Sequence, residues 1–146
     1  MPLKDSSNKV GTNPSSSKLI VLGEDDEDDE ELLKEVFSTI DPAYSLKFIR
    51  HGSKIISFLE QLDDSELPCL IVLDYNMPEL NGSEILGKLR ESARYSHIPK
   101  IIWSTSGSDT YRKLSLELGA TEYIIKPSNI KGLTEAIKYM LSLCPV

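Results

Sequence analysis

The sequence predicts an α/β fold: a doubly wound parallel sheet of five strands with helices on both faces. Three observations lead to this prediction. Short apolar runs alternate with helically spaced apolar residues five times along the chain. Several of these runs are continuously apolar, which is typical of parallel strands covered on both faces. The 146 residues fit one domain, and no internal repeat suggests another organisation.

The expected strands are residues 18–23, a short strand around residues 44–48, and residues 70–74, 100–103 and 123–125. Gly119 is expected to end the fourth helix, because glycine favours the backbone conformation that closes helices. Five helices are expected from apolar residues at helical spacing: Leu32, Leu33, Val36, Phe37 and Ile40; Ile55, Ile56, Leu59 and Leu62; Ile85, Leu86 and Leu89; Tyr111, Leu114 and Leu118; and Leu133, Ala136, Ile137, Met140 and Leu141.

The composition bounds the class of protein. Residues 1–17 are polar and rich in serine, so we expect a disordered tail followed by one domain over residues 18–146. No apolar run approaches the length of a membrane span, and the start of the chain lacks the apolar core of a signal peptide. Two cysteines are too few for a disulfide framework, which favours a reducing, cytoplasmic location.

The charge is concentrated in one place. The formal net charge is −7, and residues 24–31 are eight consecutive acids; the other 15 acids nearly balance 16 lysines and arginines. This distribution argues against a nucleic-acid-binding face and suggests a site for cations. The acids from Asp28 to Glu31 also suit the positive end of the helix that follows, whereas Glu24 and Asp25 stand ahead of that helix, at the strand tip.

Polar side chains follow four of the expected strands: Glu24 and Asp25 the first, Asp74 the third, Ser104 and Thr105 the fourth, and Lys126 the fifth. The carboxyl ends of parallel strands meet at one edge of a sheet, where ligands bind. Three converging carboxylates repel one another unless a cation neutralises them, and Mg²⁺ prefers such oxygen ligands. Lys126 and Ser104 add donors for an anion. The set therefore predicts a phosphoryl-transfer site with a carboxylate nucleophile.

From residue 18 to about residue 143 the chain resembles the receiver domains of two-component response regulators. The matching residues are the acidic pair Glu24 and Asp25, the phosphoacceptor Asp74, the loop Asn76-Met77-Pro78-Glu79-Leu80-Asn81-Gly82, the hydroxyl residue Ser104, the aromatic switch residue Tyr123, and Lys126 with Pro127. The resemblance implies a flavodoxin-like strand order of 2-1-3-4-5 and a cis peptide before Pro127. Gly23 departs from the family, which usually has an apolar residue there, so we expect a looser tip of the first strand.

The resemblance also implies a mechanism. Asp74 would accept a phosphoryl group from a sensor histidine kinase or a histidine phosphotransfer protein, with only self-phosphorylation and autodephosphorylation as chemistry of its own. Ser104 and Tyr123 would then switch conformation. Mg²⁺ would be held by Glu24, Asp25, Asp74 and the carbonyl of Asn76, and the phosphoryl oxygens would be held by Lys126, Ser104 and the N–H of Thr105.

Several alternatives remain open. The metal pair could be Asp25 and Asp26 in place of Glu24 and Asp25. A phosphatase of the haloacid dehalogenase type is a rival function, although its second aspartate would have to stand at Asn76. A receiver-like scaffold that does not take phosphate is another. The crowded acids resemble stand-alone receivers that answer phytochrome-type kinases, so we expect a downstream protein partner, no nucleic acid, no membrane, and a monomer or a phosphorylation-dependent homodimer.

Overall fold

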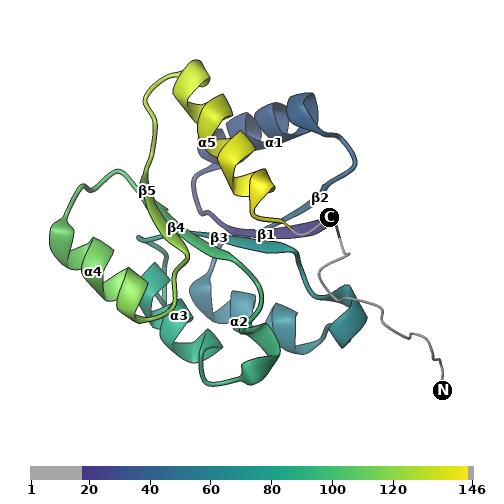
Figure 1. Cartoon of the computed structure of the whole chain (residues 1–146), viewed down its shortest axis with the longest axis vertical. Coiled ribbons are helices and arrows are strands. Elements are labelled where there is room, and N and C mark those ends of the chain that lie inside the picture. Colours follow the sequence, from purple (N-terminus) through teal and green to yellow (C-terminus); the bar gives the residue numbers. More distant parts are fainter. Residues whose placement is uncertain (1–17, 145–146) are drawn as a thin grey trace.

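The computed structural model describes residues 18–144, so the expected tail, residues 1–17, lies outside the described part of the chain. A five-stranded parallel sheet has the order β2-β1-β3-β4-β5, which confirms the predicted fold class and strand order (Figure 1). Its strands are β1 Leu19–Gly23, β2 Ser45–Ile49, β3 Leu70–Asp74, β4 Lys100–Ser104 and β5 Glu122–Ile125.

Helices cover both faces of the sheet. Helices α1 and α5 lie side by side over one face, and α2, α3 and α4 lie over the other (Figure 1). This arrangement is the doubly wound architecture that the alternating pattern predicted. The helices are α1 Glu27–Ile40, α2 Gly52–Glu60, α3 Gly82–Leu89, α4 Asp109–Glu117 and α5 Ile130–Ser142.

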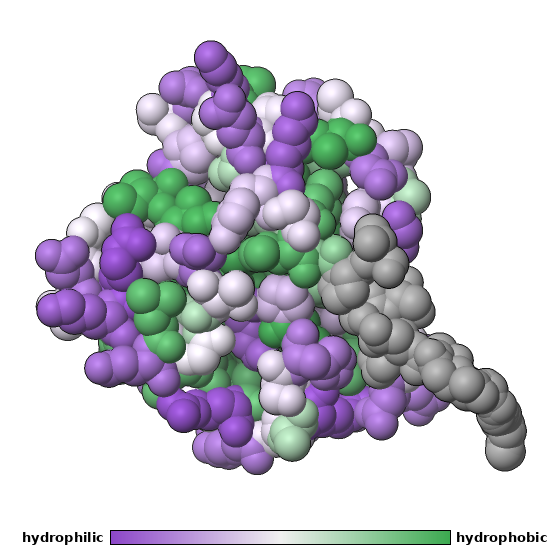
Figure 2. Space-filling view, viewed as in Figure 1, coloured by the Kyte–Doolittle hydropathy of each residue, from purple (hydrophilic) through white to green (hydrophobic). Residues whose placement is uncertain are grey.

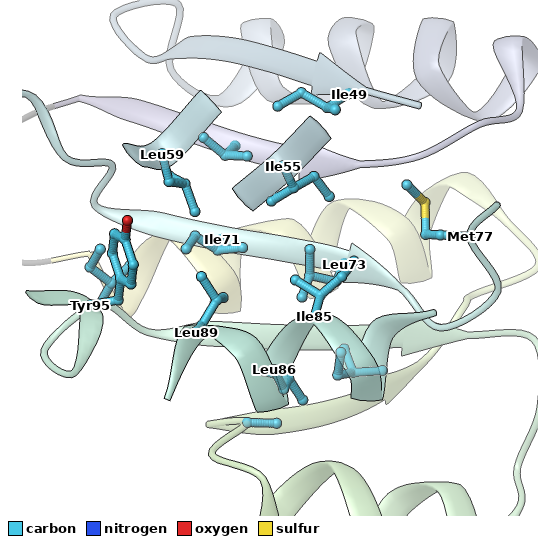
Figure 3. Packing of buried hydrophobic residues seen from close by; sticks show 14 of the residues in the cluster. Ile49, Ile55, Leu59, Ile71, Leu73, Met77, Ile85, Leu86, Leu89 and Tyr95 are labelled. Atoms are coloured by element: carbon cyan, nitrogen blue, oxygen red, sulfur yellow. The ribbon is translucent and has the colours of Figure 1, made fainter. Parts of the chain in front are cut away.

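Strand β3 lies at the centre of the molecule, and all five of its residues are buried. Its side chains alternate between two cores, because successive residues of a strand point to opposite faces. Ile71 and Leu73 pack with residues of α2 and α3 (Figure 3), while Leu70 and Val72 belong to the core beneath α1 and α5. The apolar run therefore ends at the sheet edge with Asp74 fixed from both sides.

Gly23 does not loosen the tip of β1. It is buried and keeps its register between Ile49 of β2 and Leu73 of β3. A Cβ atom at Gly23 would lie 2.8 Å from Cδ1 of Ile55 and 3.3 Å from Cδ2 of Leu73. Glycine is thus explained by the close approach of α2 to the strand, and the expectation of a looser tip is wrong.

Helix α4 is less buried than its apolar spacing predicted. Leu114 is 38% exposed and Leu116 is 45% exposed, and Ser115 is the buried residue of the helix. The residue after the helix, Leu118, packs against the core only in part. Hydrophobic residues gather at the surface over β5, between α4 and α5 (Figure 2). Spacing indicated Tyr111, Leu114 and Leu118 as the inward face of this helix, but Tyr111 and Leu114 are exposed, so the expected face is wrong.

Candidate functional site

Three carboxylates converge at the carboxyl ends of β1 and β3. Glu24, Asp25 and Asp74 each offer an oxygen atom within 4.8 Å of the others. The backbone N–H of Glu24 donates to the carbonyl of Ile49 at 3.0 Å, which continues the sheet pairing one residue past β1. Glu24 is consequently 1% exposed, whereas Asp25 is exposed. The strand tip thus holds one carboxylate inside the molecule and presents its neighbour at the surface.

The next acid, Asp26, caps a helix. Its side chain is the N-cap of α1 and accepts hydrogen bonds from the backbone N–H groups of Asp28 at 2.8 Å and Asp29 at 3.0 Å. An aspartate in this position satisfies backbone donors that the first turn of a helix leaves free. This geometry favours Glu24 and Asp25 over Asp25 and Asp26 as the pair facing Asp74.

Lys126 lies at the centre of the acidic cluster. Its Nζ is 2.6 Å from Oδ2 of Asp74, 3.4 Å from Oε1 of Glu24 and 3.2 Å from Oδ2 of Asp29. Burial alone would lower the pKa of Lys126, but the hydrogen bond to Asp74 and the charges of the three acids outweigh it and raise the pKa above its usual value. The lysine therefore stays protonated and neutralises part of the cluster.

The surroundings of Glu24 shift its pKa upward. Burial raises the pKa of Glu24 from 4.5 to about 7, although the nearby charge of Lys126 partly opposes the shift. The negative charge of Asp74 adds to the increase. An acid held close to its neutral form beside two others marks a place where a further positive charge would be stabilised.

The loop after β3 is held against Asp74. The backbone N–H of Asn76 donates to Oδ1 of Asp74 at 2.9 Å, so both oxygens of this carboxylate have a donor. Gly82 opens α3 directly behind it, where a Cβ atom would lie 3.1 Å from Cα of Tyr75 and 3.2 Å from the carbonyl oxygen of Asp74. Glycine at this position allows the helix to approach the strand end. On the side away from Lys126, the Asp74 carboxylate is therefore contacted by backbone atoms of the loop that follows β3.

Ser104 and Thr105 lie at the end of β4, as predicted. Ser104 is fully buried, and its Oγ accepts a hydrogen bond from the backbone N–H of Ser106 at 3.0 Å. Thr105 is exposed. The backbone N–H of Lys126 donates to the carbonyl of Ser104 at 2.7 Å, so β4 and β5 stay paired up to the site. This pairing fixes Lys126 beside the hydroxyl residue.

Tyr123 is already turned into the molecule. Its side chain is buried, and its hydroxyl donates to the carbonyl of Ser106 at 2.7 Å. Arg112 lies 5.0 Å from the centre of the ring and donates to the carbonyl of Tyr123 at 3.1 Å. Tyr123, one of the two residues that would switch conformation, therefore lies inward in this structure, and Arg112 of α4 covers its ring.

The peptide bond before Pro127 is trans, since no bond in the described part of the chain is cis. The cis bond that the resemblance implied is thus not found. The trans form is the lower in free energy for a peptide bond before proline, by about 0.5–1 kcal/mol, and here the backbone N–H of Lys126 still reaches the carbonyl of Ser104.

A comparison with family models gives a match to the response regulator receiver domain over residues 20–138. The chain belongs to this family. The receiver match includes all five strands except the first residue of β1, Leu19. It also includes most of α5. A phosphatase of the haloacid dehalogenase type is accordingly not favoured.

The receiver domain also resembles individual proteins. It is 32% identical over 124 residues to the response regulator Rcp1 of a Synechocystis strain, covering 83% of this chain and 84% of Rcp1. The crystal structure of the phosphorylated cyanobacterial phytochrome response regulator RcpA matches with a TM-score of 0.78 and 27% identity, over 88% of this chain and 94% of the other. The Mn²⁺-bound form of Rcp1 matches with a TM-score of 0.74 and 31% identity, over 85% and 91%.

Other features of this receiver domain were missed or lie beyond the site. Asp29 was interpreted as a helix-end acid, yet its carboxylate reaches Lys126; its place in the first turn of α1, directly after the strand tip, is the signal that could have suggested this. Arg112, which covers Tyr123, had no sequence signal of its own. In residues 18–144 no helix is long and apolar enough to cross a membrane.

Proposed function

We propose that Asp74 is the phosphoacceptor of this receiver domain and takes its phosphoryl group from a histidine kinase or a histidine phosphotransfer protein. The observation that carries this proposal is the setting of Asp74: a nearly buried carboxylate at the sheet edge, 2.6 Å from Nζ of Lys126 and grouped with Glu24 and Asp25. A carboxylate held by a cation in a crevice is a nucleophile that is positioned before its substrate arrives.

The transfer would exchange one bond for another. An oxygen of Asp74 attacks the phosphorus of the donor phosphohistidine, the phosphorus–nitrogen bond breaks, and the imidazole leaves as an acyl phosphate forms. Lys126, now on Oδ2 of Asp74, would move onto a phosphoryl oxygen. The Ser104 hydroxyl, which now accepts from Ser106, would turn to donate to another, and the backbone N–H of Thr105 would hold a third.

Receiver domains bind a divalent metal, and the residues here fit one. The carboxylates of Glu24, Asp25 and Asp74 converge, and the raised pKa of Glu24 reflects the negative charge and low solvation that a cation would relieve. We propose Mg²⁺, held by these three side chains and the carbonyl of Asn76, because hard divalent ions prefer oxygen ligands. When bound, the ion would supply positive charge to the phosphoryl oxygens.

The proposed signal is conformational. We propose that phosphorylated protein acts on a downstream protein partner, as a monomer or a phosphorylation-dependent homodimer, and that Mg²⁺-dependent self-phosphorylation and autodephosphorylation are its only chemistry. Both cysteines are free thiols, which supports a cytoplasmic location. The Rcp1 and RcpA likenesses support a kinase of the phytochrome type as the donor, since RcpA is described as a phytochrome response regulator.

Phosphorylation by a small donor tests the assignment. Incubation with acetyl phosphate or phosphoramidate and Mg²⁺ should add one base-labile phosphoryl group, detected by intact-protein mass and by reduction of the acyl phosphate with borohydride. Asp74→Asn should gain none, because an amide is not a nucleophile at phosphorus. Asp64→Asn is the matched control, since Asp64 lies away from the strand tips in an exposed turn. An equal mass gain in Asp74→Asn would contradict the assignment.

A further inference from the structure

Two buried thiols meet at the edge of the sheet opposite the phosphorylation site. Cys69 immediately precedes β3, and Cys144 lies just beyond the end of α5, 75 residues later. Their Sγ atoms are 3.0 Å apart. The end of α5 returns to the side of the sheet where the strands begin (Figure 1). The two sulfurs therefore bring the start of the central strand into contact with the last described residues of the chain.

We propose that Cys69 and Cys144 form a reversible disulfide under oxidation by a peroxide, which ties the end of α5 to the start of β3. The sulfurs need to approach by only about 1 Å to reach the length of a disulfide bond. Two core cysteines placed only to fill volume would not need to face each other across elements so distant in sequence. This inference concerns a different part of the molecule from the phosphoacceptor and does not depend on it.

The backbone around the pair is fixed on one side and free to adjust on the other. The N–H of Cys69 donates to the carbonyl of Leu19 at 2.9 Å, as part of the pairing between β1 and β3. Cys144 is held by a single-turn hydrogen bond from its N–H to the carbonyl of Leu141 at 3.1 Å. Helix ends open more readily than strands at the centre of a sheet. Cys144 can therefore move to close the bond, and its opening admits a small oxidant.

The electrostatics assign different parts to the two thiols. The hydrogen bond with Cys144 lowers the pKa of Cys69 against the effect of burial, and the charge of Lys18 acts to lower the pKa of both thiols. The same hydrogen bond and burial raise the pKa of Cys144. Either sulfur can donate this hydrogen bond, so one thiol can ionise while the other keeps its proton. We place the first step on Cys69, whose pKa is the lowered one, because the thiolate is the nucleophilic form.

The reaction balances with hydrogen peroxide as the oxidant. The thiolate of Cys69 attacks one peroxide oxygen, the oxygen–oxygen bond breaks, and hydroxide leaves to give a sulfenic acid. The sulfur of Cys144 then attacks the sulfur of Cys69, and the hydroxyl group leaves with the proton of Cys144 as water. The two sulfurs together lose two electrons to the peroxide, and two thiols and one peroxide become one disulfide and two waters.

The bond should leave the phosphorylation site working. β3 separates Cys69 from Asp74 by its full length of five residues, about 16 Å of extended chain. The disulfide closes a long loop that contains β3, β4 and β5 with the helices α3, α4 and α5, and such a link restricts the unfolded chain more than the folded one. The expected consequence is a more stable protein with a firmer last turn of α5.

The test uses the full chain, reduced and freed of reductant, then treated with hydrogen peroxide. Thiols are counted by alkylation after unfolding, and the products are mapped by peptide mass. Both thiols should disappear together in a monomer that is lighter by two hydrogen atoms, a cross-linked peptide should join Cys69 to Cys144, and dithiothreitol should restore both thiols. The melting temperature should rise on oxidation. Cys144→Ala is the matched control and should show no loss of hydrogen and no rise.

Other outcomes would overturn the proposal. These are thiols that stay reduced at a peroxide concentration that oxidises the urea-unfolded chain, sulfinic acids without a cross-link, or disulfide-linked dimers. A second measurement does not depend on rates: the ratio of the squared concentration of reduced glutathione to the concentration of oxidised glutathione at which half of the protein is oxidised. It should be at least tenfold higher for the folded chain than for the chain in urea, and an equal or lower ratio contradicts a preformed pair. Phosphorylation with acetyl phosphate should be the same in the reduced and oxidised protein.

Discussion

Burying a charged carboxylate costs free energy even beside a lysine, as Glu24 is buried beside Lys126. Protonation of the carboxylate or binding of a further cation lowers this cost. In the metal-free protein burial raises the pKa of Glu24 to about 7, so the carboxyl is mostly neutral only below that pH. Lys126 cannot fully compensate, because it also serves Asp74 and Asp29. The residue therefore stores a free energy cost that metal binding would remove.

The pH dependence of stability should reveal this cost. Between the unfolded value of 4.5 and a folded pKa of about 7, folded Glu24 keeps a proton that the unfolded chain has released. The free energy of unfolding of the metal-free protein should therefore fall as pH rises through this window, on the order of 3 kcal/mol at most. Urea unfolding at a series of pH values measures it. Glu24→Gln should flatten the decline and saturating Mg²⁺ should reduce it; a Glu24→Gln curve parallel to that of the wild type would contradict the assignment.

The proposed metal ligands can be separated experimentally from their acidic neighbours. Asp25→Ala removes one of the three converging carboxylates, so Mg²⁺ binding should weaken at least tenfold, or about 1.4 kcal/mol. Trp103, the only tryptophan, reports on binding through its fluorescence, since Nζ of Lys126 lies 5.4 Å from its ring. Asp28→Ala, an exposed acid of the same run, should bind Mg²⁺ like the wild type.

Asp26→Ala distinguishes Glu24 and Asp25 from Asp25 and Asp26 as the acidic pair that binds the metal. Loss of the N-cap of α1 should lower the free energy of unfolding by about 1 kcal/mol and leave Mg²⁺ affinity nearly unchanged. An affinity loss as large as that of Asp25→Ala would mean that Asp26 is a ligand.

At the level of elements, α4 is connected to the site by two contacts. Tyr75, next to Asp74, stacks on Tyr111 of α4 with ring centres 4.2 Å apart and planes 11° apart. Ser104 holds the loop before α4 through the N–H of Ser106, and the carbonyl of Ser106 in turn holds Tyr123. A phosphoryl group that draws the Ser104 hydroxyl away would release the second contact and leave the first. α4 is thus placed to register a change at Asp74.

Ser104→Ala tests this connection. The variant should still take a phosphoryl group at Asp74, because Ser104 is not the nucleophile. Its α4 and β5 should respond weakly to the phosphoryl mimic beryllofluoride, since the lost hydrogen bond to a charged acceptor is worth about 1.5–3 kcal/mol, enough to shift a two-state equilibrium at least tenfold. Hydrogen exchange of residues 109–125 is the measurement. A response as large as that of the wild type would show that the signal leaves through another contact, such as the stacked tyrosines.

For the whole molecule, the sequence predicted the features that topology determines. Strands such as β3 appear as apolar runs because both faces are covered, and the carboxyl ends of parallel strands must share one edge, so Asp74 and Lys126 could be placed together. Features that depend on the rotation and tilt of helices could not be predicted. The reach of Asp29 to Lys126, the meeting of Cys69 with Cys144, and the exposure of α4 are set by packing to within a few ångströms, and no spacing rule encodes them.

The uneven packing of the helices leads to a prediction about local stability. Helix α3 buries Ile85, Leu86 and Leu89 against the sheet, whereas on α4 the buried residue is Ser115. Burying a leucine or isoleucine side chain stabilises by roughly 1.5–3 kcal/mol, so α4 should open locally at a free energy at least about 2 kcal/mol below that of α3. Native-state hydrogen exchange of the two helices measures the difference.

Ser115→Ala, a small change at the buried position of α4, should leave the order of protection of the two helices unchanged, because the Ser115 hydroxyl has no hydrogen-bond partner among the described residues. Equal protection of α3 and α4 would mean that the stacking of Tyr111 on Tyr75 anchors α4 as firmly as apolar burial anchors α3, and a partner that covers the exposed leucines should raise the protection of α4 selectively.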